Sequence, residues 1–229
     1  MARGVIKAWL VVYNLLAAAG WVLTLASLVQ FILDHNTFQG AELYAAIRIP
    51  LQISQSAAML EVVHASLRFV KADPFTTAIQ VASRLFVLWF VVIPFPEVQQ
   101  SWKLTLMVVS WSLSEIPRYP FYVVNLLTDQ VPFLMKFFRY SGFLLLYPTG
   151  IAGELLCIFQ ALPEIRRTNP WSIYMPNAYN VEFSFYWFMW LVIAVYLPGS
   201  PFMYLHMMKQ RNKALKPKDS ASNKKAKPE

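Results

Sequence analysis

Long apolar runs recur along this 229-residue chain and constrain its fold more than any other feature. A helix needs about 20 mostly apolar residues to cross the hydrocarbon core of a bilayer. Such runs occupy six segments, residues 8–33, 51–69, 77–93, 102–116, 133–162 and 181–203. Because backbone groups in lipid have no water to bind, each segment must satisfy its hydrogen bonds internally as a helix. The sequence therefore predicts an all-α integral membrane protein, a bundle of six transmembrane helices.

The composition agrees with a membrane setting. Hydrophobic residues make up 57% of the chain and charged residues 14%, whereas a soluble domain is about 45–50% apolar. Segments 51–69 and 102–116 are the most polar of the six, and small or hydroxylated residues such as Ser54 and Ser56 suit interfaces between membrane helices. Residues 1–208 are expected to form one transmembrane domain, and residues 209–229 a lysine-rich cytosolic tail.

The distribution of positive charge predicts the orientation, because cytosolic segments of membrane proteins carry the excess of lysine and arginine. With a cytosolic N-terminus, fifteen of the 20 Lys and Arg residues fall on that side, and the C-terminus joins them there. The residues on the opposite side are Arg48, Lys103, Arg166 and Arg167. Lys225 and Lys227, fifth and third from the end, resemble the dilysine retrieval signal of endoplasmic reticulum membrane proteins. A basic tail after a span favours the lipid bilayer over nucleic acid as its partner.

Several ionisable residues lie within the predicted spans, and five of them are candidates for membrane depth: Glu61, His64, Arg84, Glu115 and Glu154. Such groups are costly at membrane depth and by default mark a functional site or a buried partner. Arg84 and Glu61 could instead neutralise each other, and His64, three residues after Glu61, could simply hydrogen-bond its carboxylate. A metal site is not expected, because carboxylate bundles that bind iron need the Glu-x-x-His pattern twice, with further glutamates.

Tyr147 and Glu154 form a different kind of pattern. Seven positions in an α-helix turn through about 700°, so both side chains leave the same face, about 10 Å apart along the axis. Between them Pro148 removes a backbone hydrogen bond, and Gly150 and Gly153 remove side-chain bulk. This pattern predicts a notch that another molecule can approach. The alternative of equal weight is a kinked span whose small residues pack against a neighbouring helix, with Glu154 paired to an arginine.

A phenol and a buried carboxyl on one helix face can act together as a general acid and a general base. The phenol can donate a proton while the carboxyl exchanges one, and no nucleophilic triad or phosphate-binding loop accompanies them. Elimination of water suits such a pair, because a proton leaves the carbon next to a carbonyl while a hydroxyl departs as water.

Several sequence blocks, spread over nearly the whole chain, resemble one known family. They include "YNLLAAAGW", "LEVVHASLRFV", "QVASRLFVLW", "SWSLSEIPRY", "RYSGFLLLYPTGIAGE" and "YLPGSPFMYLHMMKQR". The family is that of the 3-hydroxyacyl-CoA dehydratases of very-long-chain fatty acid elongation, also called protein tyrosine phosphatase-like proteins, and the blocks resemble its plant PASTICCINO type. The resemblance implies a hydro-lyase, without a cofactor, that converts very-long-chain (R)-3-hydroxyacyl-CoA to the trans-2-enoyl thioester. It also implies six spans in the endoplasmic reticulum membrane and, as partners, the condensing enzyme and reductases of elongation.

The family's catalytic tyrosine and glutamate correspond to Tyr147 and Glu154. We expect Glu154 to remove the C2 proton and Tyr147 to protonate the leaving hydroxyl, although the reverse assignment is chemically allowed. Lys136 precedes Tyr147 by about 16 Å of helical rise, a length that an extended pantetheine arm can cover. The phosphates of CoA are therefore expected to meet Lys136, Arg139 and Arg118.

Other polar residues are expected to support the substrate. Enolate-like charge on the thioester oxygen needs hydrogen-bond donors, for which Arg84, Arg139 or a backbone N–H near the Pro148 kink are candidates. Glu61, His64 and Glu115 are further candidate supporting residues.

The sequence departs from the family around Arg118. Pro117 and Pro120 stand where relatives usually have other residues, and two prolines are expected to end or bend the fourth helix there. The placement of Arg118 against CoA depends on how the helix passes this point.

Three rival functions can be weighed on the sequence. A phosphatase needs a thiolate with an arginine six positions on, but Pro163 stands six positions after Cys157, which is expected to be an inert core residue. A non-catalytic scaffold for elongation enzymes would use the loops and the tail. A transporter is disfavoured because no inverted repeat is evident.

Overall fold

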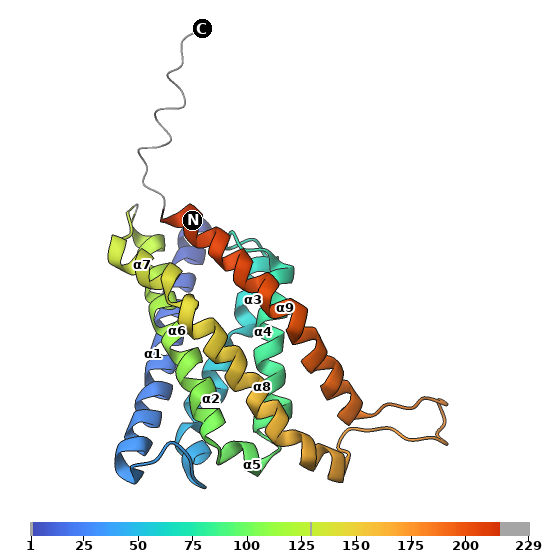
Figure 1. Cartoon of the computed structure of the whole chain (residues 1–229). Helices are drawn as coiled ribbons and strands as arrows, with labels where there is room; N and C mark the ends of the chain where they lie inside the picture. The colour runs from blue at the N-terminus through green and yellow to red at the C-terminus, as the bar shows by residue number, and fades with distance from the viewer. Residues whose placement is uncertain (1, 129, 216–229) are drawn as a thin grey trace.

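The computed structural model describes residues 2–128 and 130–215, with side chains from Gly4 onward. The regular secondary structure of these residues is helical, apart from one isolated β-bridge between Ile173 and Phe183, and loops join the helices. In order, the elements are α1 (Ala2–His35), α2 (Leu43–Ala57), α3 (Met59–Ser66), α4 (Pro74–Val87), the π-helical η1 (Leu88–Val92), α5 (Pro96–Gln99), α6 (Trp102–Leu127), α7 (Phe133–Ser141), α8 (Phe143–Thr168) and α9 (Phe185–Ala214) (Figure 1). The predicted all-α class is confirmed for the described residues.

Four stretches of helix are long and apolar enough to cross a membrane. They are Gly4–His35, Pro74–Val92, Phe133–Thr168 and Phe185–Ala214. The other two predicted spans, 51–69 and 102–116, are the two that the sequence already marked as most polar. In the structure, residues 51–69 are divided between α2 and α3, and α6 carries Glu115 and Arg118 in its interior. The structure thus supports a multi-pass membrane protein, with four candidate spans among the described residues.

Helix α6 lies at the centre of the bundle and packs most extensively against α1 and α8. Its buried side chains include Met107, Trp111 and Tyr119. The helix continues through Pro117 and Pro120 to Leu127, so of the two expected effects, an end or a bend, the prolines do not end it. A proline removes one backbone hydrogen bond, and a buried membrane helix tolerates this where neighbouring helices surround the freed groups.

Two other predicted boundaries differ from the structure. The segment predicted over 133–162 is interrupted at Gly142, which separates α7 from α8, and α8 continues to Thr168. Helix α9 extends to Ala214, so the start of the predicted tail, residues 209–214, continues the last helix. The rest of that tail, residues 216–229 with Lys225 and Lys227, lies outside the described residues.

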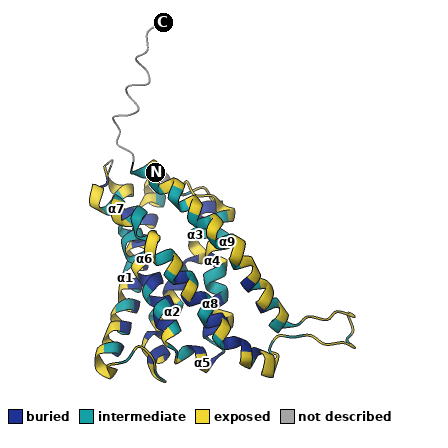
Figure 2. Ribbon diagram, in the orientation of Figure 1, coloured by how far each residue is buried: buried dark blue, intermediate teal, exposed yellow. Residues whose placement is uncertain are grey.

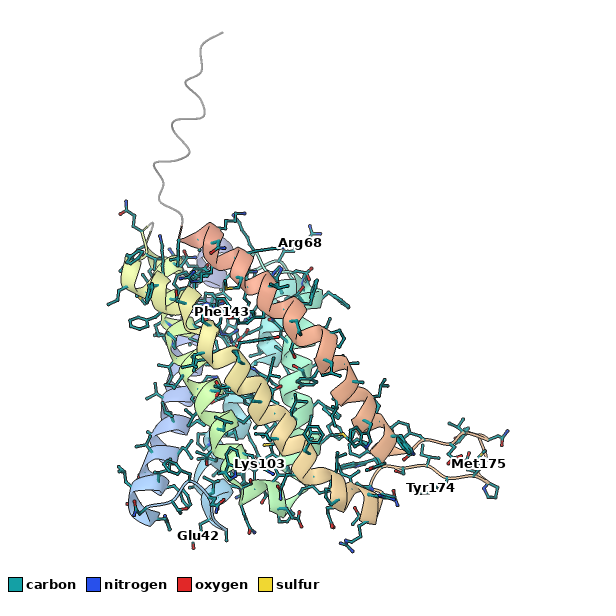
Figure 3. All side chains as sticks on the ribbon, in the orientation of Figure 1. Glu42, Arg68, Lys103, Phe143, Tyr174 and Met175 are labelled. Carbon is teal, nitrogen blue, oxygen red and sulfur yellow. The ribbon has the colours of Figure 1, made fainter. Side chains whose placement is uncertain are left out.

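The helices form a bundle in which α1 begins and α9 ends at the same end (Figure 1). Arg68 lies towards this end, whereas Glu42, Lys103, Tyr174 and Met175 lie towards the other (Figure 3). Exposed residues follow the outer faces of the helices, and buried ones gather between them (Figure 2). Many exposed side chains on α1 and α9 are large and apolar, as expected for surfaces that face lipid.

Candidate active site

Two glycines of α8, Gly150 and Gly153, allow this helix to pack closely against α6. A Cβ atom added at Gly153 would lie 2.8 Å from the backbone of Met107, and one added at Gly150 would lie 3.6 Å from the side chain of Ser110. The two glycines therefore allow close packing of α6 and α8, as small residues commonly do between membrane helices. The expected notch at Gly150 and Gly153 is filled by α6, so these glycines pack against a neighbouring helix, as the alternative predicted for them.

Tyr147 and Glu154 both contact α9. The Tyr147 hydroxyl donates to the backbone carbonyl oxygen of Ser200 at 3.3 Å. The Tyr196 hydroxyl donates to Oε2 of Glu154 at 2.7 Å. Tyr196 and Ser200 are four residues apart, about one turn of α9. The α8 side chains thus meet neighbouring turns of the same helix.

Glu154 is buried and accepts a hydrogen bond at each carboxyl oxygen. Besides the bond from Tyr196, the indole Nε1–H of Trp111 donates to Oε1 of Glu154 at 2.9 Å. Within the described part of the chain no arginine pairs with this carboxylate, so the Glu154–arginine pair of the alternative was wrong. Arg84 is linked to Glu154 only through Trp111, because its guanidinium lies 5.3 Å from the centre of the Trp111 ring, whose N–H binds Glu154.

The other charged residues at membrane depth form a network of linked ion pairs, in which arginines and glutamates alternate. Arg84 pairs with Glu115 at 2.5 Å, Glu115 pairs with Arg118 at 2.5 Å, and Arg118 pairs with Glu61 at 2.5 Å. The Tyr119 hydroxyl donates to the same Glu61 oxygen at 2.6 Å. The possible Arg84–Glu61 pair was therefore wrong, because Arg118 reaches Glu61 and leaves Arg84 to Glu115. This network of ion pairs connects α3, α4 and α6, and its Arg84 lies over the Trp111 ring.

His64 is buried against α1 and has a different partner from the one expected. The indole N–H of Trp9 donates to His64 Nε2 at 2.9 Å, and the Tyr13 ring packs edge-on against the imidazole at 4.9 Å. In the described structure Glu61 is bound by Arg118, Tyr119 and Tyr13 instead of by His64. The possible His64–Glu61 hydrogen bond was wrong, and His64 contributes to the packing of α3 on α1.

Basic residues gather on α7, next to the start of α8. The Arg139 guanidinium donates to the Tyr122 hydroxyl at 3.2 Å and lies 5.6 Å from the centre of the Tyr140 ring. Lys136 lies one turn earlier on α7, which also contacts α9. Because the helix is interrupted at Gly142, the rise of one straight helix does not give the distance from Lys136 to Tyr147.

Sequence reasoning missed Trp111, Tyr196 and the carbonyl of Ser200. Both side chains stand within the blocks that carry the family resemblance, "SWSLSEIPRY" and "YLPGSPFMYLHMMKQR". A tryptophan or tyrosine buried in a membrane bundle needs a partner for its polar atom, and this requirement was the available signal. Cys157 is fully buried in the core, as expected.

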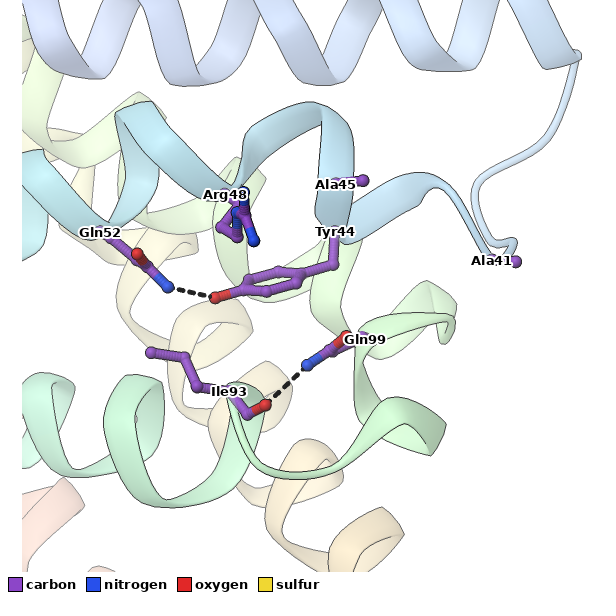
Figure 4. A pocket seen from close by; sticks show the side chains of 7 residues that line it. All are labelled: Ala41, Tyr44, Ala45, Arg48, Gln52, Ile93 and Gln99. Carbon is purple, nitrogen blue, oxygen red and sulfur yellow. Dashed lines mark hydrogen bonds between the residues drawn. The ribbon is translucent and has the colours of Figure 1, made fainter.

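A pocket of about 330 Å³ lies elsewhere, between α2, the end of η1 and α5 (Figure 4). Inside it the Gln52 amide donates to the Tyr44 hydroxyl at 2.7 Å, and the Gln99 amide donates to the Ile93 carbonyl at 2.7 Å. The lining residues are Ala41, Tyr44, Ala45, Arg48, Gln52, Ile93 and Gln99. None of the candidate site residues is among them, so this pocket is separate from the α8–α9 contact.

Comparisons with known proteins agree with the sequence blocks. A family model described as "Protein tyrosine phosphatase-like protein, PTPLA" matches residues 55–217. The protein named very-long-chain (3R)-3-hydroxyacyl-CoA dehydratase 1 of Mus musculus is 40% identical over 91% of this chain and 73% of its own length. Dehydratase 2 of Homo sapiens is 40% identical over 91% of this chain and 81% of its own. The Arabidopsis thaliana dehydratase PASTICCINO 2 is 40% identical over 91% of this chain and 93% of its own. No solved structure matches the chain.

Proposed function

Because this chain belongs to the protein tyrosine phosphatase-like family, we propose that it dehydrates very-long-chain (3R)-3-hydroxyacyl-CoA to the trans-2-enoyl thioester in fatty acid elongation. Relatives named as such dehydratases in a mammal and in a plant are each 40% identical to it over 91% of its length. The observation that carries the proposal is this identity, together with the Tyr147 and Glu154 pair facing one helix.

The reaction is a β-elimination in which Glu154 acts as base and Tyr147 as acid. Glu154 takes the proton from C2, the electrons of that C–H bond form the C2=C3 double bond, and the C3–O bond breaks. Tyr147 gives its proton to the departing hydroxyl, which leaves as water. The contacts support this assignment, because both Glu154 oxygens accept hydrogen bonds, which favours a carboxylate, and the Tyr147 hydroxyl acts as a donor. The substrate hydroxyl would replace the Ser200 carbonyl as its acceptor.

The substrate would lie between α8 and α9. Few residues of α9 are buried, so lipid-soluble chains can reach this contact from the bilayer. Lys136 and Arg139 on α7 would then meet the CoA phosphates. Arg118 is already bound by two carboxylates. Its proposed role is therefore to hold the helices around the site.

We propose that the other residues of this ion-pair network also hold the helices around the site. Arg84, Glu115 and Glu61 balance one another's charge with Arg118, and His64 fastens α3 to α1. Buried charges of this kind are stable only as complete pairs. They would keep α6, and with it Trp111, in place behind Glu154.

We further propose that six segments cross the endoplasmic reticulum membrane and that both termini are cytosolic. The charge distribution and the common end of α1 and α9 support this orientation. The condensing enzyme and reductases of elongation are the proposed protein partners, because dehydration is one step of a cycle. A tag placed after Glu229 should be removed by protease added to sealed microsomes; full protection of the tag would contradict the orientation.

The activity can be tested with purified protein in liposomes and a long-chain (R)-3-hydroxyacyl-CoA. Tyr147→Phe and Glu154→Gln should each abolish formation of the enoyl thioester while the helical circular dichroism spectrum is unchanged. Both changes preserve side-chain size and remove only the acid or the base. Equal turnover in all three proteins would contradict the mechanism, and no turnover in any would favour the alternative, a non-catalytic scaffold. A phosphatase is not favoured, because Cys157 is fully buried.

A further inference from the structure

Tyr196 is the one hydroxyl that α9 presents to the proposed base. Its neighbours Val195 and Leu197 are 60% and 72% exposed, whereas Tyr196 points into the bundle and reaches Oε2 of Glu154. Tyr196 thus turns inward between two side chains of α9 that face outward, and its hydroxyl makes a hydrogen bond there. Apolar packing alone does not explain this contact with Glu154.

The two hydrogen bonds between α8 and α9 run in opposite directions. Tyr147 of α8 donates to the Ser200 carbonyl of α9, and Tyr196 of α9 donates to Glu154 of α8. The buried residues of α9 are Phe185, Met189 and Ile193, all on the N-terminal side of Tyr196. Beyond Ile193 no residue of α9 is buried, and these two hydrogen bonds, together with the packing of the Tyr204 ring near Phe143 and Tyr147, hold α9 against α8 at the site.

Glu154 is held from two sides. Trp111 of α6 donates to one carboxyl oxygen at 2.9 Å, and Tyr196 of α9 donates to the other at 2.7 Å. A carboxylate with one donor on each oxygen cannot rotate about its terminal bond without losing a hydrogen bond. Each oxygen still has a second lone pair, so the carboxylate remains able to accept a proton. The direction from which a proton can approach is therefore fixed.

We propose that Tyr196 is a positioning residue, which orients the Glu154 carboxylate towards the C2 proton of the substrate. The proposal rests on the dehydratase function proposed above and deepens it. Orientation contributes strongly to catalysis, because a displacement of about 1 Å at a reacting group can cost about 100-fold in rate. The proposed CoA contacts, Lys136 and Arg139, lie on α7, and other contacts also hold α9 against α8, so loss of this hydroxyl should affect the rate more than substrate binding.

The test uses the full-length protein in liposomes with a long-chain (R)-3-hydroxyacyl-CoA. Tyr196→Phe removes only the hydroxyl, and we expect kcat to fall about 10- to 100-fold with KM unchanged within about twofold. The matched control is Tyr186→Phe in the same helix. Its ring lies 5.9 Å from the Arg166 guanidinium, and in the described structure its hydroxyl has no hydrogen-bond partner. This variant should keep both constants. A simple loss of folding would lower the amount of active protein in proportion, so kcat is referred to folded protein measured by size-exclusion chromatography.

Infrared spectroscopy provides a readout that does not depend on turnover. The carboxyl band of Glu154 is identified by its disappearance in Glu154→Gln, and it should shift in Tyr196→Phe but stay in place in Tyr186→Phe. An unchanged band, an unchanged kcat, or a rise in KM alone would each overturn the positioning role. If the unsubstituted protein forms no enoyl thioester, the proposed function fails and this role fails with it. Turnover that Tyr196→Phe leaves intact overturns the positioning role alone.

Discussion

Arg118 illustrates how a single side chain can decide the arrangement of charges inside a membrane bundle. It lies between Glu61 and Glu115, and its guanidinium also packs 4.6 Å from the centre of the Tyr119 ring. Arg118 pairs with both carboxylates. Glu115 also pairs with a second arginine, Arg84, whereas Arg118 is the one arginine paired with Glu61 in the described structure. Loss of Arg118 would leave Glu61 with hydroxyl donors alone. The stability of this region therefore depends on a complete set of partners more than on any one pair.

This dependence can be measured. Arg118→Met keeps much of the side chain but removes the charge, and it should lower the free energy of unfolding by about 3–5 kcal/mol, as when one partner of a buried pair is removed. The measurement is unfolding of the purified protein in mixed micelles. The matched control, Arg167→Met, breaks a pair in which the arginine side chain is 73% exposed and should change stability little. Equal effects of the two substitutions would contradict this account.

At the scale of elements, the contact between α6 and α8 is the one that carries the site. Gly153 allows the backbones to approach, and Trp111 on the α6 side then reaches Glu154 on the α8 side. The sequence predicted the apolar run that contains α8, and it identified Gly150 and Gly153 as unusual. Whether these glycines face a ligand or a helix could not be predicted, since that depends on which helices are neighbours.

The close approach at Gly153 leads to a second prediction. In Gly153→Ala the added Cβ would lie 2.8 Å from the Met107 backbone, so the helices must separate, at a cost of about 1–3 kcal/mol typical of overpacking. Unfolding in mixed micelles measures the change. In Gly199→Ala the added Cβ would meet nothing within 4 Å, so this control in a long helix should be at least as stable as the unsubstituted protein. A Gly153→Ala protein as stable as this control would refute the close packing.

At the scale of the whole molecule, hydrophobicity and family resemblance predicted the class and the function, but not the partners of the polar residues. Apolar runs predict helices because lipid leaves the backbone no other choice. The chain of Arg84, Glu115, Arg118 and Glu61 depends on contacts between helices distant in sequence, which no local pattern encodes. Whether Pro117 ends α6 or leaves it continuous was undecided for the same reason, since burial among neighbouring helices outweighs the local effect of a proline.

The central claim is that the reacting carbons of the substrate lie between α8 and α9, against Tyr147 and Glu154. The most direct measurement is photo-crosslinking of the reconstituted protein with a long-chain 3-hydroxyacyl-CoA that carries a diazirine close to C3, followed by mapping of the adducts by mass spectrometry. We expect adducts on the facing turns of α8 and α9, around Tyr147 and Tyr196, that disappear when excess unlabelled substrate is added. Adducts that compete in the same way but lie in the pocket lined by Tyr44 and Arg48 would contradict it.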